Sequence, residues 1–493
     1  MKKTSLTKNS ILNVCKTSLS IIFPLITYPY VLRVIGVSNI GITTYISSIL
    51  GFFSFFAMLG VSSYAVREGA GIRDSKTELE LFTSQIFTIN ILSAVLSLII
   101  LAVTVILIPR FHPYSILFVI LCCNVWMPAI SLDWINSVYE DYVYLSVRSI
   151  LVHIVSLACI FLFIKDESDF YTYIVLLIMP SAVEWLSNWV YCRRYVRIRT
   201  TLKPDLRKHL PKLFIFLFSA LSVSIYVSFD NTMLGWMKGE YDVGLYTPPV
   251  KIYTIMKSLM VALYIVTVPR LALLHSKNRK DDFKQLYTSL CCTISVILIP
   301  AAIGLMCISK EVIRFFGGDE YMQSIPAMQI LSMSLIAAIL GGLITGCLNI
   351  AVHREKENLV AAILAGIINC GLNVYFISKY SFIGAAFTTL IAELFVFLFS
   401  IIRLPDKSRY MDIPVILKNM GQSLLASLPV IPLSFILHRS NSTSIVCMGI
   451  MILVSAVIYF LIMFLLRNQT VIDICKNLKN RLAAFGHTEK VVQ

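Results

Sequence analysis

Long apolar stretches separated by short polar ones run along the whole chain, and they constrain its fold more than any other feature. Of the 493 residues, 57% are hydrophobic and only 14% are charged, whereas soluble globular proteins carry about 25% charged residues. An apolar run of about 18 or more residues is long enough to cross the hydrocarbon core as a helix. Strands of a membrane barrel would alternate apolar and polar residues over about ten positions, and these stretches are longer and do not alternate. The chain is therefore predicted to be an all-α integral membrane protein.

The apolar stretches, and the Pro, Gly and charge clusters between them, predict about fourteen transmembrane helices. The first stretch follows Lys2 and Lys3, but it is too long for a signal peptide and is interpreted as an uncleaved helix. The predicted helices lie near residues 10–32, 40–63, 81–108, 114–137, 143–164, 170–191, 211–236, 244–268, 285–308, 324–349, 358–378, 382–402, 413–437 and 443–466.

The distribution of positive charge gives this topology an orientation. With the N-terminus placed in the cytoplasm, 30 of the 42 lysines and arginines fall in inside segments and eight in outside loops. Positive residues concentrate in cytoplasmic loops, so both termini are predicted to be cytoplasmic. The net charge of +15 is thereby explained by topology, and no nucleic-acid partner is expected.

The most basic loop predicts how the chain is divided. Residues 192–212 separate helices 6 and 7 and predict the boundary between two pseudo-symmetric lobes of six helices. The predicted parts are an N-terminal lobe at 1–195, a C-terminal lobe at 196–405 that includes most of this linker, and a helix pair with a cytoplasmic tail at 406–493. Two comparable halves are typical of secondary transporters.

Charged side chains inside the apolar stretches are the candidate functional residues. A charge at the middle of a bilayer costs roughly 2.5–3.5 kcal/mol, so such residues usually face a cavity or a partner. Asp230 and Lys251 would both lie roughly 10 Å from the outer boundary of neighbouring helices, where an ion pair is possible, either structural or facing a central cavity. The full set is Lys16, Glu184, Asp230, Lys251, Lys257 and Glu393.

No pattern of an enzyme is present in the sequence. There is no GxSxG, HExxH, Walker A or metal-ligand motif, and the twelve cysteines lie mostly in apolar runs, where they behave as small hydrophobic residues. We therefore expect neither catalysis nor a cofactor or metal. A secondary transporter is favoured over an ATP-driven pump, a channel or a polymerase, whose catalytic site would need a larger outer loop.

Several ordered motifs resemble one family. The segment PLITYPYVLRVIG at 24–36 is similar to the first-helix signature of the bacterial polysaccharide flippases, which export O-antigen and capsule repeat units. These belong to the multidrug, oligosaccharidyl-lipid and polysaccharide exporter superfamily. Further matches are Asp133-Trp134 with Glu140 and Arg148, Val243-Gly244-Leu245-Tyr246, Phe316-Gly317-Gly318, and Gly384-Ala385-Ala386 with Glu393. The resemblance covers nearly the whole chain.

The resemblance implies a flippase of the bacterial cytoplasmic membrane. Its substrate would be an oligosaccharide repeat unit on undecaprenyl pyrophosphate, moved from the cytoplasmic to the outer face by alternating access for surface polysaccharide biosynthesis. Polysaccharide polymerase and export proteins would be further partners. Cavity cations for the substrate would be Lys16, Arg33, Lys251 and Lys257, and coupling or ion-pair residues would be Asp230, Glu393 and Glu184.

Other functions remain open at this stage. A lipid II flippase or a multidrug exporter would share the fold, although a cationic cavity is unsuited to cationic drugs. A membrane polysaccharide polymerase or an export-complex scaffold would belong to another class.

Overall fold

All secondary structure in the described part of the chain is helical. The computed structural model describes residues 22–438 and 445–476, and these ranges contain α-helices, short 3-10 turns and one π-helical turn but no strand. Two compact units are formed, residues 1–247 and 248–493. The all-α class predicted from the sequence is confirmed.

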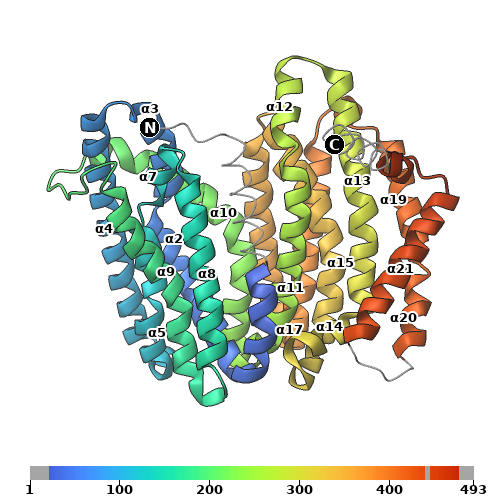
Figure 1. The fold of residues 1–493 in the computed structure, drawn as a ribbon, viewed down its shortest axis with the longest axis horizontal. Helices are drawn as coiled ribbons and strands as arrows, with labels where there is room; N and C mark the ends of the chain where they lie inside the picture. Colours follow the sequence, from blue (N-terminus) through green and yellow to red (C-terminus); the bar gives the residue numbers. More distant parts are fainter. Residues whose placement is uncertain (1–21, 439–444, 477–493) are drawn as a thin grey trace, which may run out of the picture. The chain divides into compact units, whose positions relative to one another are not determined.

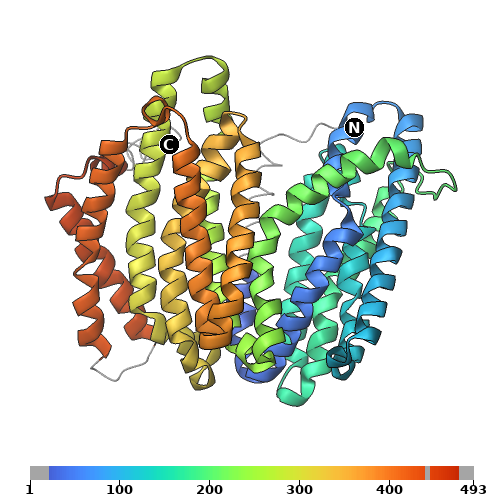
Figure 2. The ribbon, with the colours of Figure 1, turned by 180° about the vertical axis from the view of Figure 1, so that it is seen from behind.

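The first unit is a bundle of long helices with shorter ones at their ends (Figure 1). A helix at Ile22–Ile35 precedes them. Helix α10, at Leu206–Lys238, packs against α2, at Val37–Met58, and the two run side by side in Figure 2. The others are α3 (Val61–Ile72), α4 (Lys76–Leu107), α5 (Ser115–Leu121), α6 (Cys123–Ala129), α7 (Asp133–Val138), α8 (Tyr142–Phe163) and α9 (Phe170–Cys192).

Two predicted helices of this unit are broken in the structure. The helix predicted at 40–63 ends at Met58, because Leu59 and Gly60 adopt positive φ angles of 48° and 69°. A new helix, α3, then begins at Val61. The helix predicted at 114–137 is divided into α5, α6 and α7, and Pro128 in α6 lacks the backbone N–H that would continue the hydrogen-bond ladder.

The second unit begins inside helix α11, at Glu240–Ile265, which starts in the first unit. Helix α17, at Glu355–Arg403, is interrupted at Ser381, whose φ of 51° and ψ of −134° are not helical. The other helices are α12 (Val268–Ser276), α13 (Lys280–Cys307), α14 (Ser309–Gly317), α15 (Ile325–Gly342), α16 (Asn349–Ala351), α18 (Lys407–Tyr410), α19 (Ile413–Ser427), α20 (Val430–His438) and α21 (Ile445–Leu465), with a π turn at Leu343–Leu348.

Nine helices in the described residues are long and apolar enough to cross a membrane, or ten if a bent pair at Gly449–Leu465 and Gln469–Lys476 forms one span. The prediction of an integral membrane protein is confirmed at this level. The number fourteen stays a prediction, as does the division into six-helix lobes at residue 195. The observed units divide at residue 247, because α10 packs on helices of the first unit.

Candidate functional site

A buried ion pair in the second unit joins two residues that the sequence predicted separately. Glu393 on α17 is 3% exposed, and its Oε1 lies 2.6 Å from Nζ of Lys257 on α11. The hydroxyl of Tyr253, one turn before Lys257, donates to the same oxygen at 2.8 Å. A buried carboxylate is tolerated only when it is paired and hydrogen-bonded, and both conditions are met here. The ammonium of Lys257 is therefore engaged by protein.

A second charged cluster lies in the first unit. Arg148 on α8 is 7% exposed, and its two terminal nitrogens contact the two carboxylate oxygens of Asp133 at 2.9 and 3.0 Å. Such a bidentate contact is stronger and more directional than a single hydrogen bond. Glu184 on α9 lies farther away, with Oε1 4.0 Å from Arg148, and its backbone oxygen accepts from Arg148 at 3.4 Å.

This cluster carries two carboxylates against one guanidinium. The side chains of Asp133 and Glu184 are 41% and 30% exposed, whereas that of Arg148 is 5% exposed. The excess negative charge therefore lies at the accessible side. Glu184 was predicted from the sequence, but Asp133 and Arg148 were missed as site residues, although both were among the motif matches.

The structure places three further predicted residues on separate helices. Asp230 is buried on α10 in the first unit, and Lys251 is half-buried on α11 in the second unit. Because they belong to different units, their pairing remains a prediction. Arg33 is exposed near the end of the helix Ile22–Ile35, and Lys16 lies outside the described residues.

A polar cluster crosses the break in α17. Thr388 donates to Oδ1 of Asn373, and Asn373 donates to Oδ1 of Asn369 at 3.1 Å. All three side chains are buried. The break at Ser381 separates Thr388 from the two asparagines, so the bond between Thr388 and Asn373 ties the two arms of α17 together. Nδ2 of Asn369 has no hydrogen-bond partner among the described atoms.

Neither unit offers a metal centre in the part of the chain that the structure describes. No group of three or more His, Cys, Asp or Glu residues there has suitable geometry. The buried polar groups instead form ion pairs and hydrogen bonds between apolar helices. Such an arrangement can hold, exchange or release a charged partner, which is what transport through a membrane requires.

Comparison with known proteins decides the family. A sequence profile for polysaccharide biosynthesis proteins matches residues 6–275, more than half of the chain. The chain belongs to the polysaccharide biosynthesis protein family. The chain is also similar to a putative O-antigen transporter from Escherichia coli (strain K12). The two are 23% identical over 348 residues, which cover 67% of this chain and 80% of that protein. The family resemblance noted in the sequence is confirmed.

Solved structures agree on the fold. The lipid II flippase MurJ, in an inward closed conformation, is similar with a TM-score of 0.71 and 19% identity, covering 93% of this chain and 99% of that one. An inward-facing multidrug resistance MATE transporter of the MOP superfamily is similar with a TM-score of 0.54 and 15% identity, covering 78% and 98%. At these identities the likeness concerns the fold alone. Together with the family, it indicates a membrane transporter and not an enzyme.

Proposed function

We propose that this protein is a flippase that moves oligosaccharides linked to undecaprenyl pyrophosphate from the cytoplasmic to the outer face of the cytoplasmic membrane. The observation that carries the proposal is membership of the polysaccharide biosynthesis protein family. The distant likeness to a putative O-antigen transporter supports it. Its lobes would alternate between inward and outward access, both termini would be cytoplasmic, and the last two helices would help to guide the lipid tail.

The physical need for such a protein is clear. Each hydroxyl without a hydrogen-bond partner costs a few kcal/mol in hydrocarbon, so an oligosaccharide with about ten hydroxyls faces a barrier of tens of kcal/mol. A polar path lined by cations removes this barrier, because Lys and Arg are suitable charge partners for phosphate. We propose Lys16, Arg33, Lys251 and Lys257 for this role.

The ion pair of Lys257 with Glu393 refines the proposed role of both residues. Lys257 can meet a substrate phosphate only if its ammonium leaves Glu393, because the two atoms are 2.6 Å apart. We propose that the pair opens during the cycle and that the anionic substrate exchanges with Glu393 for the lysine. Asp230 and Glu184 remain candidates for coupling or for structural ion pairs.

A lipid II flippase is the second candidate. It is favoured by the similarity to MurJ over 93% of this chain, but that similarity reports the fold. The two candidates differ in the sugar attached to the same kind of lipid carrier. Loss of a flippase for repeat units would cause lipid-linked oligosaccharide to accumulate without arresting cell-wall synthesis.

The test is complementation of a strain that lacks this protein. The wild-type chain should restore surface polysaccharide and remove the accumulated lipid-linked oligosaccharide. Lys257→Gln and Asp230→Asn should reduce export while the protein remains in the membrane. Lys418→Gln is a matched control, because this lysine also lies in a predicted span but is exposed. Normal polysaccharide in the strain without the protein would refute the proposed function.

A further inference from the structure

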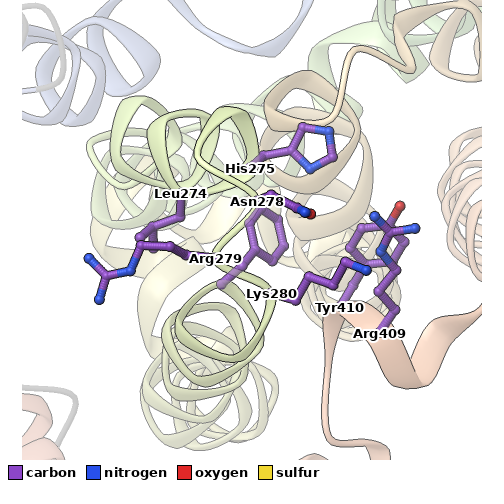
Figure 3. A pocket seen from close by; sticks show the side chains of 8 residues that line it. Leu274, His275, Asn278, Arg279, Lys280, Arg409 and Tyr410 are labelled. Atoms are coloured by element: carbon purple, nitrogen blue, oxygen red, sulfur yellow. The ribbon is translucent and has the colours of Figure 1, made fainter.

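A small basic pocket lies in the second unit, away from the charged clusters described above. It is formed where the turn between α12 and α13 meets the short helix α18 (Figure 3). Its enclosed volume of about 10 Å³ is about that of one water-sized probe. The pocket is therefore too small to enclose a sugar, but a compact group can sit on it. Its polar lining consists of His275, Asn278, Arg279, Lys280, Arg409 and Tyr410.

Two positive side chains converge at this pocket. The tips of Lys280 and Arg409 point toward one another beside Tyr410, with His275 on the same side (Figure 3). Neither Lys280 nor Arg409 forms an ion pair with any other described residue, and no carboxylate lines the pocket. Like charges repel at close range, so their convergence without a protein counter-ion favours an external anion.

The acidic groups near the pocket lie outside its lining, and Asp281 lines a different hollow. Arg279 points away from the other cations (Figure 3), and its Nε lies 2.6 Å from the carboxylate of Asp282. Asp406, which precedes α18, accepts a hydrogen bond from Ser408 at 3.0 Å. The arrangement therefore separates one neutralised arginine from a pair of cations that remain available to a ligand.

Aromatic packing positions His275 and Tyr410, and Arg409 lies against the Tyr410 ring. The ring of Phe283, which is 3% exposed, packs edge to face against two other rings. Its centroid lies 6.2 Å from that of His275 and 5.8 Å from that of Tyr410. The guanidinium of Arg409 lies 5.7 Å from the centre of the Tyr410 ring. Packing of this kind orders the side chains before a ligand arrives, which reduces the entropy lost on binding.

The pocket lies where two apolar helices end. The turn joins the candidate spans Glu240–Ser276 and Lys280–Cys307, so its depth corresponds to the headgroup region of a bilayer. Arg270, Lys277 and Lys284 add positive charge to the same segment. Basic pockets between membrane helices on the cytoplasmic side characteristically bind lipid phosphates. We propose that His275, Asn278, Lys280 and Arg409 form a binding site for the phosphate of a membrane lipid headgroup.

Two lipids offer this chemistry, namely an anionic phospholipid such as phosphatidylglycerol and undecaprenyl pyrophosphate. Binding of each to the purified full-length protein can be measured by native mass spectrometry, with phosphatidylcholine as the zwitterionic reference. Each surface cation contributes about 1 kcal/mol to anionic lipid binding, so Lys280→Ala or Arg409→Ala should weaken binding about fivefold, and the double variant roughly 25-fold. The control Lys277→Ala, on the same turn but outside the pocket, should change binding less than twofold.

The outcomes separate the sources and test the site. Weakened binding of both probes, or of phosphatidylglycerol alone, assigns the site to bulk anionic lipid, and weakened binding of undecaprenyl pyrophosphate alone assigns it to the polyprenyl carrier. If the double variant does not fold, the single alanine variants test the site. The charge-preserving variants Lys280→Arg and Arg409→Lys should bind lipid as the wild type does. Unchanged binding of both probes in the folded alanine variants would overturn the proposal. Because the experiment measures lipid binding and not export, failure of the lipid-site proposal would leave the flippase proposal standing.

Discussion

At the scale of single residues, two positive side chains within the apolar helices have carboxylate partners. Lys257 contacts Glu393, and Arg148 contacts Asp133. Removing one partner of such a pair leaves the other charge unpaired and poorly solvated. The stability of the protein therefore depends on both partners of each pair.

The Lys257–Glu393 pair gives a prediction about stability. Removing one partner of a buried pair typically costs 3–5 kcal/mol, and because Lys257 is 25% exposed we expect about 2–3 kcal/mol for Lys257→Met. Glu393→Gln should also destabilise the protein, but the double variant should lose less than the sum of the two. Melting of the purified variants, followed by tryptophan fluorescence, would measure this coupling. Additive losses would mean that the pair contributes nothing.

His209 predicts how stability depends on pH. It is buried at the start of α10, between the hydroxyl of Tyr64 and Oε1 of Gln85, at 2.8 and 2.7 Å. Burial, assisted by the nearby positive Lys208, lowers the pKa of His209 below its ordinary value. The folded protein therefore binds this proton less readily than the unfolded chain, so the free energy of unfolding falls as the pH drops below about 6.5.

The measurement is the melting temperature between about pH 7.5 and pH 5, where the unfolded histidine becomes protonated. Wild type should lose stability on acidification, and His209→Gln should flatten this dependence because glutamine does not titrate. Equal slopes in the two proteins would show that other groups cause the acid sensitivity.

The sequence predicted single residues better than their partners. Lys257 and Glu393 were identified because a charge in an apolar stretch is unusual. Their contact was not predicted, since 136 residues separate them and nothing local indicates which helices pack together. Arg148 and Asp133 were missed because both lie near the predicted ends of helices, where charges are ordinary.

At the scale of elements, the positions of helices followed from apolar length, but their internal breaks did not. Helix α8 occupies Tyr142–Phe163 where 143–164 was predicted. The break at Leu59 and Gly60 was not predicted, because both residues lie inside an uninterrupted apolar stretch. Its cause is the backbone, since both residues have positive φ angles, which glycine adopts readily but leucine does not.

Close packing of α2 against the start of α11 gives a prediction about small residues. A Cβ at Gly41 would lie 1.8 Å from the backbone oxygen of Glu240, whereas one at Gly51 on the same helix would meet nothing within 4 Å. Gly41→Ala must therefore push two backbones apart, and overpacking of this kind costs typically 1–3 kcal/mol. Size-exclusion chromatography and melting of the two variants should show a loss for Gly41→Ala and little change for Gly51→Ala. Equal stability would contradict the contact.

At the scale of the whole molecule, helix length limits how the chain can cross the membrane. Helix α17 has 49 residues and would extend about 74 Å if straight, more than twice the roughly 30 Å thickness of the hydrocarbon core. The break at Ser381 lies between the helices predicted at 358–378 and 382–402, where the sequence places a loop. This argues that α17, which forms one of the nine candidate spans, supplies two crossings, while the total of fourteen stays a prediction.

Helix α10 decides the topology in the same way and can be tested directly. It has 33 residues and would extend about 50 Å, long enough to cross, although it is not among the nine candidate spans of the described residues. If it crosses, the chain crosses three times between the loop at Asp166 and the turn at Asn278, through α9, α10 and the candidate span Glu240–Ser276 that contains α11 and α12. These two positions then face opposite sides. Alkaline phosphatase should then be active when fused after Asp166 and inactive after Asn278, because it folds only outside the cytoplasm, while a fluorescent protein should show the reverse. The positive turn at 277–280 should remain inside. If alkaline phosphatase were active in both fusions, α10 would not cross the membrane. Every later helix would then have the reverse orientation, and the basic pocket and the C-terminus would lie outside the cytoplasm.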